Sequence, residues 1–296
     1  MKKLLGVSLL GLGMLAISQN SLFADSSEYL SSFNNIKVES DAIELKISRG
    51  EEFYIDIEVP KKEGKFSYEV KNDTLYIEHE FPFNKKYFSW FAGSSDNYIY
   101  NVEIFIPEDV DLNEIDIEAN IGAVGIYDLS IDTLKINSTM SAVELEENVL
   151  KNIDIDTTMG AVKIVGTLNG TTNIDTTMGA ISISGNLYGY TNIDTNMGAV
   201  DIVGNLNGST DIDTTMGAIS IAGNLNGDTN IDANMGAIII ETPQSEHEFN
   251  YTLKSSTPAI LLNNQSLGTS YQTKDTNLSS NLNISVTLGS IEIYTK

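Results

Sequence analysis

The chain has 296 residues, with 17 Lys and Arg against 41 Asp and Glu, which gives a formal net charge of −24. A chain this acidic, with a single arginine at Arg49, is a poor partner for nucleic acid, whose phosphates need clustered basic side chains. Because the chain has no cysteine, it excludes disulfides, thiolate metal sites and cysteine nucleophiles. The composition, 41% hydrophobic and 20% charged, is typical of a folded protein.

The first residues predict an export signal. Residues 1–3 are a short positive start, residues 4–17 are an apolar run, and a more polar stretch ends at Ala24. This layout is typical of a secretory signal peptide, so we expect cleavage after Ala24 and removal of residues 1–24. The apolar run is short for a helix that spans a bilayer, and an uncleaved anchor is the alternative. We therefore expect a periplasmic, cell-surface or secreted protein with no transmembrane segment after cleavage.

Residues 25–114 predict an N-terminal β cap that is rich in aromatic side chains and leads into opening coils. Alternating polar and apolar residues predict strands at 42–47, 53–59, 66–70, 74–78 and 99–106. Between two of these segments, Asn72-Asp73 is a plausible hairpin turn. Caps are required because an uncapped stack of strands exposes an edge that recruits other chains.

The segment 81–91 combines several aromatic side chains with two lysines and no acid. Aromatic faces beside lysines suit a carbohydrate, a protein partner or a membrane interface. We favour the simpler interpretation of a hydrophobic loop folded over the first coil. If the region holds a partner-binding site, its candidate residues are Tyr87, Phe88, Trp90 and Phe91.

An internal repeat dominates residues 115–242. The tripeptide Met-Gly-Ala recurs at a constant interval, with each start numbered 19 higher than the one before: Met159, Met178, Met197, Met216 and Met235. Stepping back by the same interval reaches Met140-Ser141-Ala142 and Ile121-Gly122-Ala123, so seven copies are recognisable without an insertion.

Each copy shows the period of two that is typical of β-strands. Ile174, Thr176 and Met178 are expected on one face, with Asp175 and Thr177 on the other. Gly160 and its equivalents are expected at a corner where a side chain would collide with the neighbouring coil. Helix is disfavoured by the density of Gly, Asn, Thr and β-branched residues.

A single copy, with its two short strands, cannot bury an apolar face alone, so the copies must stack. The sequence therefore predicts an all-β fold, a parallel β-solenoid (β-helix) with one 19-residue coil per copy, right-handed by the general chirality of strand crossovers. An open repeat of antiparallel hairpins is the alternative. Residues 243–296 lose the period and are expected to supply C-terminal coils and a cap, closing with a degenerate copy at Leu288-Gly289-Ser290.

Three short segments give the chain a family resemblance: residues 102–107, the glycine-containing repeat at 120–124, and the closing segment 288–293. With this layout the chain resembles the bacterial putative-adhesin family of β-strand-repeat domains of unknown function. The resemblance implies a β-solenoid exported to the cell envelope, with adhesion proposed and no catalytic residues to transfer.

One acidic side chain per coil forms the most conspicuous polar feature: Asp156, Asp175, Asp194, Asp213 and Asp232. Carboxylates about 4.8 Å apart repel one another, and calcium held between coils is one way to offset that repulsion. The alternative, which we favour, is a solvated face screened by salt, because Ca²⁺ prefers six or more oxygen ligands. No other cofactor is expected.

The sequence offers no catalytic residues. No Lys or Arg occurs in residues 164–250, and neither a nucleophile with a base nor a phosphate-binding Gly-Lys motif is visible. The sequence favours an exported, non-enzymatic β-solenoid that acts as a structural or adhesive module and binds a cell-envelope protein or glycan. The alternatives are a polysaccharide-active β-helix enzyme, identified by a basic residue folded beside the aspartates, and calcium-dependent surface assembly.

Overall fold

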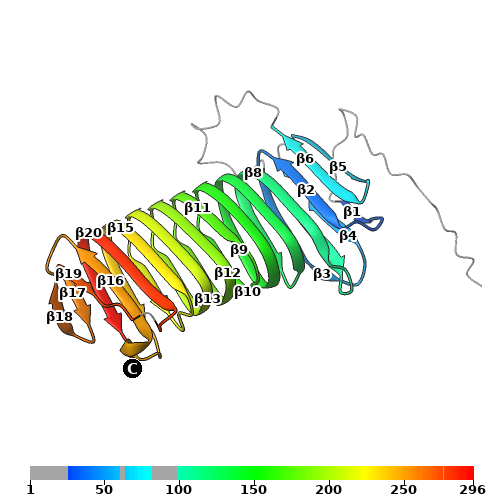
Figure 1. Cartoon of the computed structure of the whole chain (residues 1–296). Coiled ribbons are helices and arrows are strands. Elements are labelled where there is room, and N and C mark those ends of the chain that lie inside the picture. Colours follow the sequence, from blue (N-terminus) through cyan, green and yellow to red (C-terminus); the bar gives the residue numbers. More distant parts are fainter. Residues whose placement is uncertain (1–25, 61–63, 82–98, 276) are drawn as a thin grey trace, which may run out of the picture.

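The computed structural model describes residues 26–60, 64–81, 99–275 and 277–296. The described chain is almost entirely β and forms one long stack of coils (Figure 1). Both the predicted signal peptide and the aromatic residues 87–91 lie outside the described residues. Among the residues that are described, no helix has the length and apolar character needed to cross a bilayer.

The repeats form eight consecutive strands in the middle of the stack. They are β8 (Leu112–Tyr127), β9 (Ser130–Met159), β10 (Val162–Leu168), β11 (Thr172–Met178), β12 (Ile181–Met197), β13 (Val200–Met216), β14 (Ile219–Ala222) and β15 (Asp228–Glu241). Their pairings are parallel, and Ile174 pairs with Ile155 on one side and Ile193 on the other, each one repeat away in the sequence. The predicted parallel β-solenoid with one coil per copy is confirmed, and the alternative of antiparallel hairpins is wrong.

One irregularity is hidden in the constant spacing. Val165 pairs with Glu146, one full repeat before it, but Gly166 pairs with Asn148, because Glu147 bulges with a φ of 58°. The chain recovers the register before Ile153, which pairs with Thr172. A bulge and a shortened turn cancel within one copy, so counting residues between motifs could not reveal either.

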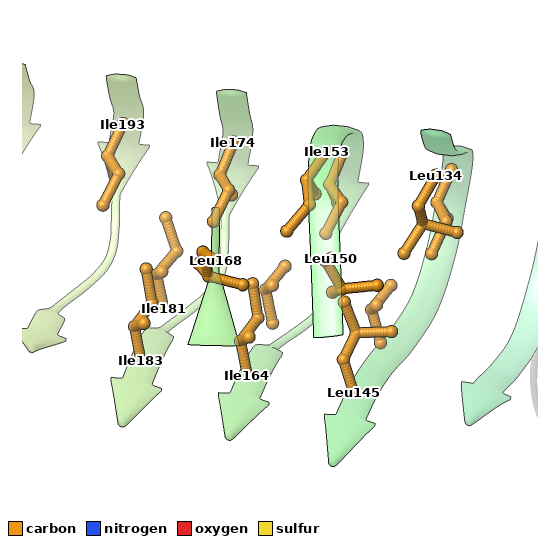
Figure 2. Packing of buried hydrophobic residues seen from close by; sticks show 14 of the residues in the cluster. Leu134, Leu145, Leu150, Ile153, Ile164, Leu168, Ile174, Ile181, Ile183 and Ile193 are labelled. Carbon is orange, nitrogen blue, oxygen red and sulfur yellow. The ribbon is translucent and has the colours of Figure 1, made fainter. Parts of the chain in front are cut away.

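Inward side chains from successive coils form continuous apolar rows. One row passes through Ile155, Ile174, Ile193, Ile212 and Ile231, all buried. Figure 2 shows such side chains packing between strands on opposite sides of the coils, with Ile174 and Ile193 on one side and Ile164 and Ile183 on the other. Each coil is too small to enclose a core, and stacking supplies the neighbours that exclude water.

The face predicted for the methionines is wrong. Ile174 and Thr176 are buried as expected, but Met178 is 39% exposed. Strict alternation stops at the Met-Gly corner, where the chain changes direction, so Thr177 and Met178 both face solvent. A period of two holds only along a straight strand.

The corner glycines have the steric role predicted for them. A Cβ atom on Gly179 would lie 1.9 Å from the carbonyl oxygen of Gly160 in the preceding coil, and one on Gly198 would lie 1.7 Å from the oxygen of Gly179. No side chain fits at these distances, which confirms that Gly179 and Gly198 are needed at their corners.

At the N-terminal end the coils are not stacked in chain order. Strands β2 (Asn35–Ser40) and β3 (Ile43–Gly50) lie between β8 and the outermost parallel coil, which is built from β6 (Thr74–Glu80) and β7 (Tyr100–Pro107). Antiparallel strands then close the end: β5 (Lys65–Lys71) pairs with β6, β4 (Tyr54–Glu58) with β7, and β1 (Ser26–Tyr29) with β4. All five strands predicted for this region are present, and the β5–β6 hairpin turns at Asn72 and Asp73, both with positive φ.

The C-terminal end repeats this arrangement. Strand β20 (Ser280–Tyr294) lies between β15 and the outermost coil formed by β16 (Phe249–Ser255) and β17 (Ile260–Leu262). The degenerate copy is in structural register, because Leu288 pairs with Met235. Strand β18 (Gln265–Gly268) pairs antiparallel with β17, and β19 (Ser270–Gln272) pairs antiparallel with β16, so these two strands close this end. A short 3-10 turn, η3 (Glu246–Glu248), precedes β16 in the chain.

Candidate functional site

One side of the solenoid carries a regular array of polar side chains, which we call the polar face. In each central coil it consists of the three outward residues of the strand that precedes the Met-Gly corner, such as Asn173, Asp175 and Thr177. Buried Thr172, Ile174 and Thr176 alternate with them and anchor the strand in the core. The pairing therefore fixes each outward group about 4.8 Å from its equivalent in the next coil.

The five candidate aspartates form one row on the polar face, which we call the aspartate row. Asp175 pairs with Asp156 and Asp194, and Asp213 pairs with Asp194 and Asp232, so the row is continuous. The pKa values of Asp175 and Asp213 are raised above 3.8, first by partial burial and then by the neighbouring carboxylates. Ionising these carboxylates is therefore less favourable than in water, because they are partly buried and repel one another.

The structure extends this row beyond the residues that the sequence identified. Towards the N-terminal end it continues through Asn137 and Glu118 to Glu39 and Glu78, and towards the C-terminal end through Ser285 to Lys254. Stepping back from Asp156 by the repeat length could have found Asn137 and Glu118. Glu39 and Glu78 could not be found in this way because their coils lie out of chain order.

Lysines neutralise acids only in part of the stack. Lys163 contacts Glu144 at 2.9 Å and also Glu146, while Lys135 contacts Glu114 at 2.8 Å, all in coils before Thr172. From Asp175 to Asp232 the row has no basic neighbour in the sequence. Solvent ions screen the carboxylates in this stretch. Among the described residues, Asn230 and Tyr190 also donate hydrogen bonds to Asp211.

Amide side chains bind the polar face together along the axis of the stack. Asn230 donates to Asp211 at 2.6 Å, and Asn283 donates to Asn230 at 2.8 Å. On another side of the coils, Asn205 donates to Asn186 at 2.7 Å. Amides are thus hydrogen-bonded between coils at these positions, which fixes the positions of the polar groups.

The geometry of the aspartate row bears directly on the calcium hypothesis. It supplies one carboxylate per coil, whereas Ca²⁺ takes six to eight oxygen ligands. Among the described residues, no three His, Asp or Glu side chains converge in a way that could hold a metal ion. Calcium binding at Asp156, Asp175, Asp194, Asp213 or Asp232 stays a prediction.

A shallow trough of about 430 Å³, which we call the C-terminal trough, lies on the polar face across β12, β13, β15, β20 and β16. The Tyr190 ring, 41% exposed, stands at one end, and its hydroxyl donates to Asp211 at 2.7 Å. Lys254 stands at the other end of this lining, which also includes Asp213, Asp232 and Asn283. An aromatic ring, carboxylates, amides and one cation therefore share a single concave surface.

A larger groove of about 760 Å³ lies at the N-terminal end of the polar face and is lined by acids, including Glu39, Glu78 and Glu118. His79 also lines it but is buried, with its Nδ1 atom accepting from the amide of Ala42 at 3.4 Å. Burial lowers the pKa of His79 to about 4, although the charge of Asp41 acts in the opposite direction. This histidine is therefore neutral at pH 7, and the charged side chains that line the groove are all acids.

The aromatic candidates Tyr87, Phe88, Trp90 and Phe91 lie outside the described residues. Tyr190 and Lys254 were not among the candidates from sequence. Tyr190 is one of three aromatic residues between residues 115 and 242, which was an available signal. Lys254 was not accessible to sequence reasoning, because the chain passes through β16 before β20 inserts beside β15.

Comparison with known proteins gives a family match and a set of similar folds. The family model described as Toastrack DUF4097 matches residues 33–293, in agreement with the resemblance noted from the sequence. No curated protein sequence matched the chain.

Solved structures with similar folds include a putative adhesin from Parabacteroides distasonis, at 12% identity and a TM-score of 0.48, covering 92% of this chain and 96% of the other. A putative adhesin from Parabacteroides merdae is 14% identical with a TM-score of 0.40, and the coverage is 92% and 95%. A putative lipid binding protein from Parabacteroides distasonis is 14% identical with a TM-score of 0.33, and the coverage is 92% and 96%.

Proposed function

Because the chain belongs to the Toastrack DUF4097 family, we propose that it is a non-enzymatic β-solenoid that binds a glycan in a bacterial cell envelope through the C-terminal trough. The solenoid acts as a rigid support, and the trough supplies the contacts. Export rests on the signal peptide predicted for residues 1–24.

The chemistry of the C-terminal trough is the observation that carries this proposal. A sugar ring has an apolar face that packs on an aromatic ring and a rim of hydroxyls that hydrogen-bond to carboxylates and amides. Tyr190 offers the ring, and its hydrogen bond to Asp211 holds it in place. Asp213, Asn230 and Asn283 offer hydrogen-bonding groups at the interval set by strand pairing.

Repetition suits an extended polymer better than a small ligand. The same outward groups recur from coil to coil, so a linear chain of sugars laid along the stack would meet similar groups at each step. Several weak contacts of this kind add together when their spacing is fixed, and the rigid pairing provides that.

The arrangement of charges favours binding over catalysis. The cation nearest to the aspartate row in the trough is Lys254, which lies two coils beyond Asp232 with Ser285 between them. Acid and base catalysis needs groups within hydrogen-bonding reach of the reacting atoms, and two coils correspond to about 9.6 Å. The presence of Lys254 in the same trough nevertheless makes a polysaccharide-active enzyme the second candidate.

A glycan array that includes neutral, acidic and amino-sugar polymers tests the proposal, followed by titration of the bound glycans against variants. Tyr190→Ala is expected to abolish binding without changing the melting temperature, because the ring is exposed. Tyr188→Ala is the matched control, since Tyr188 lies in the same coil, is 45% exposed and does not line the trough. Equal loss in both variants, or no glycan bound by the wild type, would contradict the proposal.

Two further measurements separate the alternatives. A polysaccharide-active enzyme releases new reducing ends from a bound polymer, and Lys254→Met would stop that release, whereas a binding module leaves the polymer intact. Calcium-dependent assembly requires that Ca²⁺ raise the melting temperature relative to EDTA at matched ionic strength, since a ligand of the native state must stabilise it. An unchanged midpoint would remove the calcium alternative.

A further inference from the structure

All six methionines beyond residue 14 lie in one row, which we call the methionine row: Met140, Met159, Met178, Met197, Met216 and Met235. Strand pairing places Met178 opposite Met159 and Met197, and Met216 opposite Met197 and Met235. Met140 lies one repeat before Met159 and pairs with Ile121 on its other side. The row contains the only sulfur atoms in residues 15–296, because the chain has no cysteine.

The methionine row is accessible to solvent. Met159 is 37% exposed, and the four that follow are each 39% exposed, at the corner where the chain leaves the polar face. Exposed apolar side chains in a continuous line are unusual on a soluble surface and indicate an interaction. These side chains are therefore accessible to a ligand, while the backbone beneath them is held by strand pairing.

Packing alone does not require methionine at this corner. Ile121 and Leu288 occupy the same position in coils at the two ends of the row, so a hydrocarbon side chain fits there. The copies also differ at nearby outward positions, where Lys163, Ser182 and Asp201 occupy one row. The copies between the two ends nevertheless all keep the same thioether.

A thioether sulfur is a soft donor, which selects soft cations such as Cu(I) over Ca²⁺ or Mg²⁺. Metal bonds to sulfur measure about 2.3 Å, taking zinc as a guide, so a cation held between two sulfurs spans about 4.6 Å. Side chains in adjacent coils recur at about 4.8 Å. The spacing of the row therefore suits one cation between each pair of neighbouring methionines.

The electrostatics of the neighbouring surface also favour a cation. The aspartate row runs parallel to the methionine row, three residues earlier on each strand, with Asp175 before Met178 and Asp194 before Met197. No Lys or Arg occurs in residues 164–250 to oppose it. Negative potential along this side of the rod raises the local concentration of cations.

We propose that adjacent methionines of the methionine row bind a soft monovalent cation, Cu(I) or Ag(I), through two sulfur ligands from neighbouring coils. The cation bridges coils and needs no change in the backbone. This site is separate from the C-terminal trough, so the experiment on cation binding and the experiment on glycan binding test independent proposals.

The test compares two variants of the full chain that each lose three sulfurs from the row. The spaced variant, Met159→Leu, Met197→Leu and Met235→Leu, keeps Met140, Met178 and Met216, which have no sulfur in either adjacent coil. The adjacent variant, Met140→Leu, Met159→Leu and Met235→Leu, keeps Met178, Met197 and Met216 in three successive coils. Both variants should fold, because Leu288 already occupies this position, and their thermal melts check that.

Affinity is measured by titrating Ag(I) in chloride-free buffer and by competition of Cu(I) against a chromogenic chelator. The adjacent variant should bind nearly as tightly as the wild type, whereas the spaced variant should bind at least about tenfold more weakly, a loss of about 1.4 kcal/mol. X-ray absorption at the metal edge should show two sulfur ligands in the wild type and the adjacent variant.

Three results would overturn the proposal. The first is that the wild type does not bind the cation, and the second is that the spaced and adjacent variants bind it with equal affinity. The third is that neutralising Asp175, Asp194 and Asp213 abolishes binding and that the absorption spectrum shows oxygen ligands. Equal affinities would mean that isolated thioethers suffice, and oxygen ligands would assign the cation to the aspartate row.

Discussion

Buried threonines show how a single hydroxyl is satisfied in each coil. Thr176 donates to Thr195 at 2.9 Å, and Ser138 donates to Thr157 at 2.9 Å, both along the axis of the stack. The same row reaches Thr214, which pairs with Ala233, so the next coil offers no hydroxyl. Within the described residues, the buried Thr214 Oγ1 has no hydrogen-bond partner. One alanine therefore leaves a polar atom buried without compensation.

Replacing threonine by valine in this row should have opposite consequences in neighbouring coils. Thr195→Val removes the hydroxyl that accepts the hydrogen bond of Thr176. The free energy of unfolding is expected to fall by about 1 to 3 kcal/mol, because the buried Thr176 hydroxyl is left without a partner. Thr214→Val removes an unpaired hydroxyl of nearly the same shape and should be neutral or stabilising. Chemical denaturation of both variants gives the comparison, and an equal loss would contradict it.

The aspartate row makes a second prediction, about pH. Folding raises the pKa of Asp175 above its ordinary value of 3.8, so the folded chain holds this proton more tightly than the unfolded chain. The stabilising contribution is therefore full below pH 3.8 and is lost as pH rises through the higher pKa of the folded state. Above that range the ionised row weakens the fold.

Asp175→Asn should accordingly raise the melting temperature at pH 7 and lose its advantage at low pH and at high salt, since protonation and screening both relieve the repulsion. Asp109→Asn, in an exposed turn away from the row, is the matched control. A gain that persists at pH 3 or in high salt would show that the carboxylates of the row are not the cause.

Residue burial was predictable from the sequence wherever the strand is straight. Ile174 and Thr176 were placed correctly by alternation, and the corner glycines by their need for space. Met178 was not, because alternation says nothing about a corner where the chain changes direction. Tyr190 and Lys254 were missed for another reason, since they come to line one trough only after β20 inserts between β15 and β16.

At the scale of elements, the interior coils were predictable and the ends were not. A constant repeat interval dictates stacking, because identical copies present identical faces to one another. At each end the coil that pairs with the repeats comes from a chain terminus: β2 and β3 at one end, and β20 at the other. This order depends on long-range pairing that leaves no periodic signal in the sequence.

This order predicts that the fold survives the removal of one internal copy but does not survive the removal of the last strand, β20. Deleting residues 181–199 joins Ala180 to Val200 and leaves every remaining coil with an equivalent neighbour, so the fold should persist. Truncation before Ser280 removes β20 and exposes the paired edges of β15, β16 and β17. That protein is expected to aggregate or unfold.

Circular dichroism and size-exclusion chromatography of the two deletions provide the measurement. The prediction fails if the internal deletion unfolds the protein, or if the truncated chain stays monomeric with an unchanged melting temperature. Either outcome would mean that coils are not interchangeable in the way their pairing implies.

For the whole molecule, the structure shows where the net charge of −24 lies, which the composition alone does not. Many of the acids lie in register on one face, with cations paired to acids mainly in the earlier coils. A rod with a patterned anionic side repels its own copies. At both ends, short antiparallel strands cover the edges of the outermost parallel coils, which would otherwise recruit other chains. The same side presents the aspartate row, the C-terminal trough and the methionine row.

Equivalent residues of successive copies are direct neighbours in a parallel stack, and the polar face and the methionine row both depend on this register. The chain has no cysteine, so introduced pairs can be read without background. Asp175→Cys with Asp194→Cys places two cysteines in paired positions about 4.8 Å apart, within the Cα separation of about 4.4 to 6.8 Å that a disulfide accepts. Asp175→Cys with Asp213→Cys skips a coil and separates them by about 9.6 Å.

Mild oxidation of dilute protein, followed by mass spectrometry of the unreduced chain, is the measurement. We expect an intramolecular disulfide in the adjacent pair and free thiols in the skipped pair. A disulfide in the skipped pair, or none in the adjacent pair, would contradict the stacked register on which both the polar face and the methionine row depend.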